Sequence, residues 1–467
     1  MDIGGRMIRN LDTNFKRILF DNLVLRTREK GYLIMNLRSF RRTFITEEQY
    51  EILCQVEQRL ENNQKINREE EQIYHYFLER RQFLSTEQIK SYDDNRFLWY
   101  KNKIDAAWPL VNSLTITPTF SCNFKCKYCY QREFPDKSSY MEKEDIDAIC
   151  EYVKFINGTE CCFDGIKSVS INGGESCQPR NVEVINYVLE KFSKNKECTF
   201  GLYTNGSQLT MLKEKVDFAR FDVIQVSLDG YAELFPAING VSEDNFQKVL
   251  DGIEFIVEKV KTVKLVCMLT PMIIENVNKF IDILDARGIL KHENISLQFS
   301  IISNFSKETI DSEFMDLKQY LEFRKRFKKE NTLYNVHLGT IREARSIAKL
   351  VFREMEKIDV GEHACSTLES RGMMFAPNGN VYFCMYTGPD KEEIGCYRSP
   401  KETDKQKYME NLYRSANKMP MCRECSLKYI CRGGCPLFAS AQGMSLSEGY
   451  CGLYKSEYFW ESLEELF

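Results

Sequence analysis

Histidine is scarce in this sequence, with four residues among 467. The sequence also lacks an apolar run long enough to cross a bilayer. Its first residues, MDIGGRMIRNLDTNFKR, lack the apolar core of a secretory signal peptide. We therefore expect a cytoplasmic protein with no membrane partner, in which any metal site draws mainly on ligands other than histidine.

A strong excess of charge of one sign is missing as well. The chain has 64 Lys and Arg against 68 Asp and Glu, a net charge of −4. Nucleic-acid-binding domains are usually strongly basic, so we expect no nucleic-acid partner. A hydrophobic fraction of 43% and a charged fraction of 28% are ordinary for globular protein, and the length is sufficient for two or three domains.

Cysteine, by contrast, is abundant, with 18 residues. An exported chain would use them in disulfides, but no export signal is present and a chain of this length does not need such cross-links. In a reducing compartment, clustered cysteines more often bind metal. Soft thiolate ligands favour iron–sulfur clusters or zinc.

Residues 1–105 differ in pattern from the rest of the chain. Two strand-like runs, GYLIMNL and RRTFI, precede helical patterns at 46–60 and 67–84, each opened by a capping residue. This order of strands and then helices predicts a small winged-helix-like domain.

Residues 106–335 alternate strands with helices, which predicts βαβ units and a parallel sheet. The six expected strands are SLTIT, IKSVSIN, CTFGLYT, DVIQVSL, VKLVCML and ISLQFSI. Helices are expected at 141–157, 179–194, 207–218, 242–260 and 275–288, with one more after 312. Six units are too few for a closed eight-stranded barrel, so we predict an α/β fold with a partial (β/α)6 barrel. Its reactive side should be the edge at the C-terminal ends of the strands.

The remaining chain is expected to form a connecting helix within 336–359 and a cysteine-rich domain with a C-terminal helix at 360–467. This last region contains little regular pattern.

The segment SCNFKCKYCYQ follows the first barrel strand and has the spacing C-x3-C-x2-C, with Cys122, Cys126 and Cys129. Three thiolates can hold three irons of a [4Fe–4S] cluster and leave one iron open to a small molecule. The alternative is a structural zinc site with a distant fourth ligand. Zinc sites usually pair two C-x2-C knuckles, and no second knuckle lies nearby.

This cysteine motif at this place in a partial barrel resembles the radical S-adenosylmethionine (SAM) enzymes. The resemblance implies that the open iron binds the amino and carboxylate groups of SAM. It also implies that SAM is cleaved to methionine and a 5′-deoxyadenosyl radical, which abstracts hydrogen. Tyr128 would shield the cluster near the adenine. No catalytic residue is assigned beyond this cluster.

Further SAM contacts are expected at the ends of the next strands. NGGES supplies Gly173, Gly174 and Glu175: paired glycines let the backbone approach a ligand closely, and a carboxylate suits the SAM ammonium group. QVSLDG supplies Ser227 and Asp229 for the SAM carboxylate and ribose. YTNG at 203–206 ends at the same edge, but a simple turn explains it equally well. Cys177 is expected to be an inert thiol.

The C-terminal cysteines form a second series: Cys365, then G-x4-C ending at Cys384, then CRECSLKYICRGGC, then Cys451. This series resembles the seven-cysteine SPASM domain of radical SAM peptide-modifying enzymes. The resemblance implies two auxiliary [4Fe–4S] clusters, and so three clusters in all. The distal cluster would be held by Cys422, Cys425, Cys431 and Cys451, and the proximal cluster by Cys365, Cys384 and Cys435. One proximal iron is left without a cysteine, to be filled by Cys396 or by a substrate thiolate.

The N-terminal region resembles the leader-binding domain of maturases that act on ribosomal peptides. This resemblance implies that the substrate is a precursor peptide, and that its leader segment adds a β-strand to the edge of the N-terminal sheet. Residues 1–45 have ten Lys or Arg against four Asp or Glu, which suits an acidic leader. The alternative is an ordinary cap domain with a solvated basic face. An electron donor such as flavodoxin or ferredoxin is also implied.

The sequence therefore predicts a radical SAM/SPASM peptide maturase that installs a cross-link, with a cysteine thioether favoured. A carbon–carbon cross-link or another peptide oxidation is the alternative on the same scaffold. Sulfatase-maturing relatives have an aspartate at the position of Met385, so this residue counts against sulfatase maturation as the activity. A non-catalytic electron carrier and a structural zinc protein are the rivals from other classes.

Overall fold

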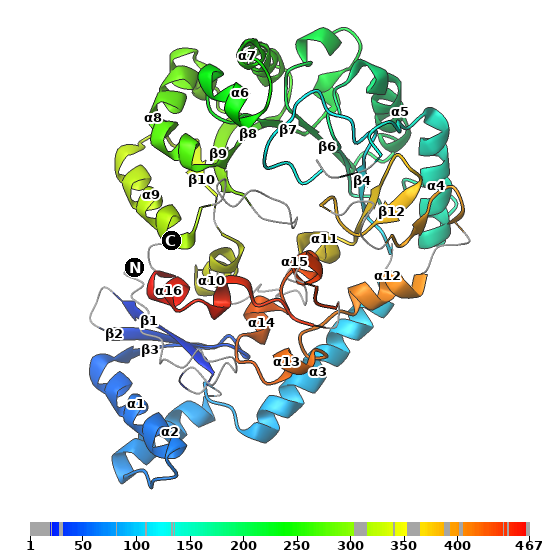
Figure 1. Cartoon of the computed structure of the whole chain (residues 1–467). Helices are drawn as coiled ribbons and strands as arrows, with labels where there is room; N and C mark the ends of the chain where they lie inside the picture. Colours follow the sequence, from blue (N-terminus) through cyan, green and yellow to red (C-terminus); the bar gives the residue numbers. More distant parts are fainter. Residues whose placement is uncertain are drawn as a thin grey trace. The chain divides into compact units, whose positions relative to one another are not determined.

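The computed structural model (Figure 1) forms two compact units. The first comprises Met1–Ala106, Thr340–Cys365 and Tyr413–Phe467, and the second comprises Ala107–Gly339 and Ser366–Leu412. The residues that the structure describes are 19, 21–27, 31–80, 82–107, 110–131, 134, 136–302, 315–339, 341–352, 365–386, 393–400, 405–441, 443–445 and 448–463. Most of the basic N-terminal segment lies outside them.

The second unit is built on a ten-stranded sheet with the order β10-β9-β8-β7-β6-β5-β4-β11-β12-β13. Its parallel strands are β4 (Ser113–Ile116), β5 (Ser168–Ile171), β6 (Thr199–Thr204), β7 (Val223–Ser227), β8 (Thr262–Leu269), β9 (Ile295–Ile301), β10 (Val336–Leu338) and β11 (Gly372–Phe375). The strands β12 (Asn380–Tyr382) and β13 (Gly395–Cys396) continue the sheet in antiparallel fashion. The predicted α/β fold with a partial barrel is confirmed.

All six predicted barrel strands are present, as β4 to β9. The sheet extends beyond them at both ends, because β10 adds to β9 and β11 adds to β4. The segment predicted as a connecting helix therefore begins as a strand, at residues 336–338. Both extra strands are only three or four residues long, which is too short for a clear alternating pattern.

The strands form because their alternate residues fill one core. Leu202, Ile224, Val263 and Ile295 are neighbours in register across β6 to β9, and each is at most 2% exposed. Burial of each such side chain contributes roughly 1.5–3 kcal/mol. A shift of one residue in any strand would turn its apolar set out of this core.

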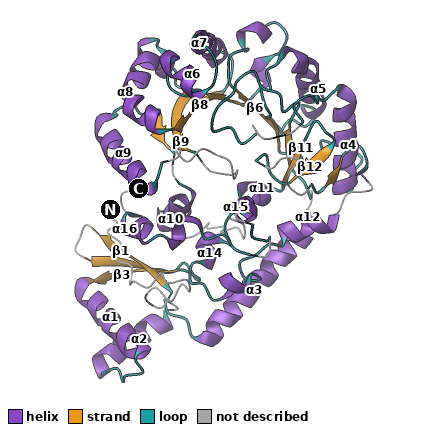
Figure 2. Cartoon of the chain, in the orientation of Figure 1, coloured by secondary structure: helices purple, strands orange, loops and turns teal. Residues whose placement is uncertain are grey.

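Helices line the outer side of the curved barrel sheet (Figure 2). They are α4 (Lys143–Asn157), α5 (Val182–Phe192), α6 (Phe235–Ile238), α7 (Asp244–Val257), α8 (Pro271–Ala286) and α9 (Leu317–Glu330). Two further helices of this unit are α11 (Ser366–Glu369) and α12 (Lys405–Leu412).

The helix predicted at 207–218 is wrong. This segment forms only the 3-10 turns Thr210–Leu212 and Phe218–Arg220. Leu209, Leu212 and Val216 are buried and have helical spacing, which explains the error. The Asp217 side chain accepts a hydrogen bond from the backbone N–H of Ala219, so it caps the second turn instead of continuing a helix.

The first unit begins with an antiparallel sheet, β1 (Asn22–Thr27), β2 (Gly31–Asn36) and β3 (Arg42–Thr46). Three helices follow, α1 (Glu47–Glu61), α2 (Arg68–Glu79) and α3 (Thr86–Asp105), as the strand-then-helix pattern predicts. Thr46, Asn67 and Ser85 each complete a capping box at the start of these helices.

The same unit includes the end of the chain. It contains α10 (Arg342–Phe352), α13 (Pro420–Arg423), α14 (Lys428–Cys431), α15 (Pro436–Ala441) and α16 (Glu457–Glu461). Residues 413–463 thus share a compact unit with the N-terminal region, although they belong to the predicted SPASM domain; the boundaries at 105, 335 and 359 stay predictions. Within the described ranges, none of the helices has the length and apolar character needed to span a membrane.

Candidate active site

The first cysteine motif forms a loop at the C-terminal end of β4, as expected. The Cys126 Sγ accepts a hydrogen bond from Asn239 Nδ2 at 3.3 Å. The Cys122 Sγ accepts one from the Phe124 backbone N–H at 3.3 Å. Asn239 also anchors this loop through its backbone carbonyl, which accepts from the Lys125 N–H at 2.9 Å. Donors thus face the sulfur atoms, which favours their thiolate form.

Burial opposes the thiolate form at two of these cysteines. Cys122 is exposed at the loop surface, yet desolvation by its neighbours, with the negative charge of Glu175 in addition, raises its pKa to about 12. Burial raises the pKa of Cys126 well above its usual range, and the charge of Asp229 adds to this rise. A bound metal centre would act in the opposite direction, because a metal ion deprotonates a coordinated thiol.

Glu175 is a buried carboxylate at the end of β5, with 1% of its surface exposed. It accepts hydrogen bonds from Thr204 Oγ1 at 2.5 Å and from the backbone N–H groups of Asn205 and Cys177, both at 2.7 Å. Burial raises its pKa, while these three donors act in the opposite direction. Glu175 thereby ties the loop after β5 to the loop after β6.

Gly173 and Gly174 pack against the start of the cysteine loop. A Cβ on Gly173 would lie 2.5 Å from the Thr119 carbonyl oxygen, and a Cβ on Gly174 would lie 2.1 Å from the Ser121 carbonyl oxygen. The Gly174 N–H donates to the Thr119 carbonyl at 2.9 Å. These two glycines therefore allow the loop after β5 to pack closely against the backbone at the start of the cysteine loop.

Asp229, after β7, is also 1% exposed. Its carboxylate accepts hydrogen bonds from the Tyr128 hydroxyl, from Asn239 Nδ2 at 3.0 Å and from the Met268 backbone N–H at 2.8 Å. Burial raises its pKa, and these donors oppose the rise. Ser227, two residues earlier, has an exposed side chain at the end of β7.

The structure thus brings Cys126, Tyr128 and Asp229 together, and Asn239 joins Cys126 to Asp229. Sequence reasoning missed Asn239, which carries no motif signal. It also left Asn205 of YTNG undecided, and Asn205 Nδ2 lies 3.9 Å from the Cys122 Sγ. Cys177 is fully buried, in agreement with the expectation of an inert thiol.

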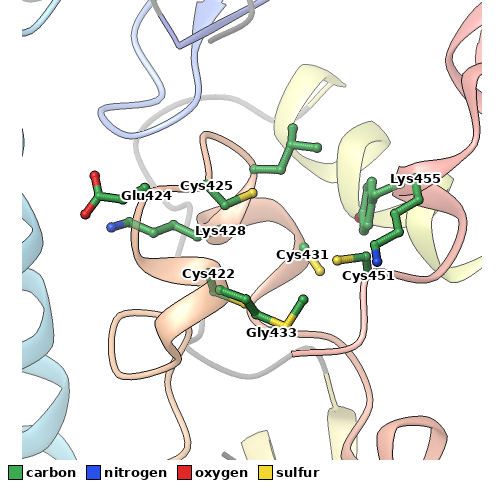
Figure 3. A pocket seen from close by; sticks show the side chains of 11 residues that line it. Cys422, Glu424, Cys425, Lys428, Cys431, Gly433, Cys451 and Lys455 are labelled. Carbon is green, nitrogen blue, oxygen red and sulfur yellow. The ribbon is translucent and has the colours of Figure 1, made fainter. Parts of the chain in front are cut away.

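The four cysteines predicted for the distal cluster surround one cavity of about 130 Å³ (Figure 3). Its lining includes Cys422, Cys425, Cys431 and Cys451. The backbone is shaped closely around these sulfurs, because a Cβ on Gly449 would lie 2.4 Å from the Cys422 Sγ. Four thiolates around one small cavity are a donor set that fits a fully ligated [4Fe–4S] cluster.

In the described part of the chain, no group of three His, Cys, Asp or Glu side chains is arranged to hold one metal ion. A [4Fe–4S] cluster does not need such convergence, since each thiolate binds a different iron. Burial raises the pKa of Cys425 to about 12, which opposes its thiolate form, and a metal centre would act in the opposite direction.

The three cysteines predicted for the proximal cluster are divided between the units. Cys365 and Cys435 belong to the first unit and Cys384 to the second, so their assembly stays a prediction. Within the second unit, Cys396 pairs with Asn380 at the start of β12 and lies beside Gly379, whereas Cys384 follows the end of that strand. The length of β12 therefore separates Cys396 from Cys384.

Met385 also lies in the second unit. Its carbonyl accepts a hydrogen bond from the Tyr130 hydroxyl at 3.0 Å, and Asn172 Nδ2 lies 3.6 Å from its sulfur. The thioether provides no proton-accepting group of the kind that a carboxylate would provide.

Comparison with known families agrees with this geometry. Residues 116–286 match the model of the Radical SAM superfamily. The chain contains a radical SAM domain. This domain spans β4 to β8 and includes the three-cysteine loop, Glu175 and Asp229.

Among curated proteins, the radical SAM domain is similar to GTP 3′,8-cyclases. The identity is 30% over 152 residues with the enzyme of Aliarcobacter butzleri, covering 32% of this chain and 44% of that protein. A probable GTP 3′,8-cyclase of Saccharolobus islandicus is 28% identical over 215 residues, covering 45% of this chain and 65% of that protein. The match thus covers roughly half to two thirds of these curated relatives.

Solved structures extend the likeness beyond the radical SAM domain. Streptococcus suis SuiB bound to the precursor peptide SuiA has a TM-score of 0.54 at 18% identity, over 93% of this chain and 98% of that chain. The enzyme anSMEcpe with bound AdoMet has a TM-score of 0.52 at 20% identity, over 76% of this chain and 94% of that chain. At this identity the likeness is one of fold.

The packing of the glycine pair gives a test of the site. We expect Gly174→Ala to prevent normal cluster assembly, because its Cβ would collide with backbone atoms that cannot move aside. The free energy of unfolding should fall by about 1–3 kcal/mol, typical of overpacking. Gly158→Ala is the matched control: nothing lies within 4 Å of its Cβ, and its φ of +65° costs only about 1 kcal/mol. Urea unfolding and iron content of the reconstituted proteins measure both effects; equal effects of the two changes would contradict this account.

Proposed function

We propose that this protein is a radical SAM peptide maturase that installs an intramolecular cross-link, most simply a cysteine thioether, in a ribosomally made precursor peptide. The observation that carries the proposal is the presence in one chain of a radical SAM domain and a separate cavity lined by four cysteines. The fold likeness to SuiB, solved with its precursor peptide, supports a peptide substrate.

The radical SAM site is assigned to Cys122, Cys126 and Cys129. These three cysteines would hold a cluster that would supply the electron for the reductive cleavage of SAM. Asn239 and the Phe124 N–H donate to two of the sulfurs, which orients them and stabilises their negative charge. Glu175, Ser227 and Asp229 are the proposed contacts for SAM, with Tyr128 beside them.

The overall reaction balances without a side-chain base. One hydrogen atom leaves the peptide carbon as part of 5′-deoxyadenosine. The thiol would lose its proton to solvent as the carbon–sulfur bond forms, and a cluster held by the C-terminal cysteines would accept the remaining electron. A base at Met385 is therefore not required, and the absence of a carboxylate there disfavours sulfatase maturation.

The direct test uses cysteine-containing peptides encoded beside the gene, incubated with anaerobically reconstituted protein, SAM and a reduced flavodoxin or ferredoxin. Mass spectrometry should show a loss of two hydrogens per bond and the loss of one alkylatable thiol. Loss of two hydrogens with every thiol still alkylatable would indicate a carbon–carbon bond instead. The Cys126→Ala variant should form no 5′-deoxyadenosine yet keep its auxiliary iron; undiminished 5′-deoxyadenosine would overturn the proposal.

Leader binding is proposed at β3, one of the two edge strands of the N-terminal sheet. Phe44 on this strand is 67% exposed, so its ring is available to a bound peptide. We expect Phe44→Ser to weaken precursor binding about tenfold or more, typical of an aromatic anchor. SAM cleavage without peptide should be unchanged.

Tyr76→Ser is the control for Phe44→Ser, because Tyr76 is an exposed aromatic residue of the same module, 43% exposed, on α2. Fluorescence anisotropy with a labelled precursor gives both affinities. If the two variants bind the precursor equally well, leader binding at this edge is excluded.

The proximal cluster is proposed to use Cys365, Cys384 and Cys435 without Cys396. The place of Cys365, Cys384 and Cys435 in the SPASM-like cysteine series supports this ligand set. Cys396→Ala should therefore keep the full iron content and the cross-linking activity, whereas Cys384→Ala should lose about a third of the iron of three [4Fe–4S] clusters. Iron and acid-labile sulfide analysis distinguishes the two; loss of iron from Cys396→Ala would make Cys396 the missing ligand.

A further inference from the structure

Four charged side chains form a continuous buried chain within the first unit. Arg38 Nε lies 3.2 Å from Asp21 Oδ2, and Arg38 Nη1 lies 2.9 Å from Asp93 Oδ2. Lys428 Nζ lies 2.5 Å from the same Asp93 oxygen. Anions and cations alternate, and the exposed fraction of these side chains is between 1% and 18%. Because charges so shielded from water interact strongly, each one depends on its neighbour.

This chain of charges runs from the N-terminal sheet to the distal cysteines. Asp21 precedes β1, Arg38 follows β2, and Asp93 lies on α3. Lys428 is the first residue of α14, the helix that ends at Cys431. The N-terminal module thus supplies the counter-charge for a cation at the distal cysteine site.

Lys428 is fixed in place more firmly than lysines usually are. Its Nζ donates to the Arg423 carbonyl at 2.8 Å as well as to Asp93, and its side chain is 1% exposed. The next residue, Tyr429, donates its hydroxyl to the other Asp93 oxygen, and Arg96 lies 4.4 Å above the Tyr429 ring. Asp93 therefore holds both of the first two residues of α14.

Lys428 also contributes to the lining of the cavity formed by the distal cysteines, although its Nζ points away from the sulfur atoms, towards the side of Glu424 (Figure 3). Lys455 lines the same cavity but is exposed to solvent. Water and salt screen the exposed charge far more than the buried one. In this chain the two lysines therefore provide a natural comparison of a buried and a screened cation beside one site.

Arg414 is another buried cation of this part of the chain. Arg414 is held by carbonyl groups, among them those of Gly433 and Gly434. Lys428 differs in that its partner is a carboxylate, so the charge that it presents depends on Asp93.

We propose that Lys428 sets the reduction potential of the distal cluster, and that Asp93, held by Arg38, sets how much of the lysine charge the cluster experiences. The inference rests on the proposed function only in taking Cys422, Cys425, Cys431 and Cys451 as ligands. A reduced cluster has one more negative charge, so a buried cation beside it favours reduction. Lys428, Asp93 and Arg38 are accordingly positioning residues that act on the electron acceptor and not on the peptide.

The test measures the midpoint potential of the distal cluster by redox titration followed by electron paramagnetic resonance. The full chain is used with Cys122, Cys126 and Cys129 replaced by alanine, so that only auxiliary signals remain. Lys428→Met should lower the ratio of reduced to oxidised distal cluster at a fixed potential about tenfold, which is 59 mV for one electron. Lys455→Met, the matched control, should change the ratio less than about twofold because its charge is screened.

Two further variants separate charge from structure. Asp93→Asn should raise the reduced fraction, because it removes the counter-charge and leaves the lysine. The double change Asp93→Asn with Lys428→Met removes one charge of each sign and should return the potential towards that of the parent, as a coupled pair does. A merely structural role would not produce opposite shifts that cancel.

The outcomes distinguish this inference from the proposed function. A distal signal in the parent that does not respond to Lys428→Met, or that responds equally to Lys455→Met, overturns the role of Lys428 alone. A parent without any distal signal overturns the ligand assignment and with it the proposed cofactor set. If Lys428→Met takes up less iron than the parent, the Asp93→Asn variant provides the test instead. An increase in the midpoint potential of its distal cluster supports the inference, and an unchanged midpoint potential overturns it.

Discussion

The arrangement of the strand ends at the barrel edge depends on two buried carboxylates beside the cysteine loop, Glu175 and Asp229. An isolated carboxylate in such a place would cost several kcal/mol, so each must be surrounded by donors. Glu175 takes its donors from the ends of β5 and β6, and Asp229 takes one from the end of β8. The need to satisfy these charges therefore fixes the strand ends relative to one another.

The same requirement explains why the cysteine loop has a single arrangement. Asn239 can donate to both Cys126 and Asp229 only if the loop after β4 and the loop after β7 lie in contact. The glycine pair after β5 permits a third contact, since no side chain at Gly174 would leave room for Ser121. A site that must bind a reactive centre is thus preorganised by hydrogen bonds and by close backbone packing.

Sequence patterns predicted the barrel well, because βαβ units repeat a strong local signal. They failed where the signal was short or ambiguous: β10 has three residues, and the apolar spacing of Leu209, Leu212 and Val216 fits a helix that does not form. The candidate cluster cysteines were chosen by their spacing alone. Asn239 and Asp93 were not identified, because each acts on a partner far away in the sequence, Cys126 at 113 residues and Lys428 at 335 residues.

The joining of both ends of the chain in one compact unit bears on how the protein is made. The N-terminal sheet and α3 leave the ribosome first, but Lys428 and Tyr429 follow only after roughly 300 more residues, which takes on the order of 15–60 s of synthesis. Until then, of the ion pairs that the structure describes for these residues, Arg38 can form those with Asp21 and Asp93. The barrel strands β4 to β10 are synthesised before Lys428. They therefore lie in sequence between two parts of the first compact unit, which is still incomplete when they are made. Asp93 thus meets Lys428 only after all the barrel strands have been made, so iron delivered before then would find the barrel loop formed and the distal cysteine site incomplete.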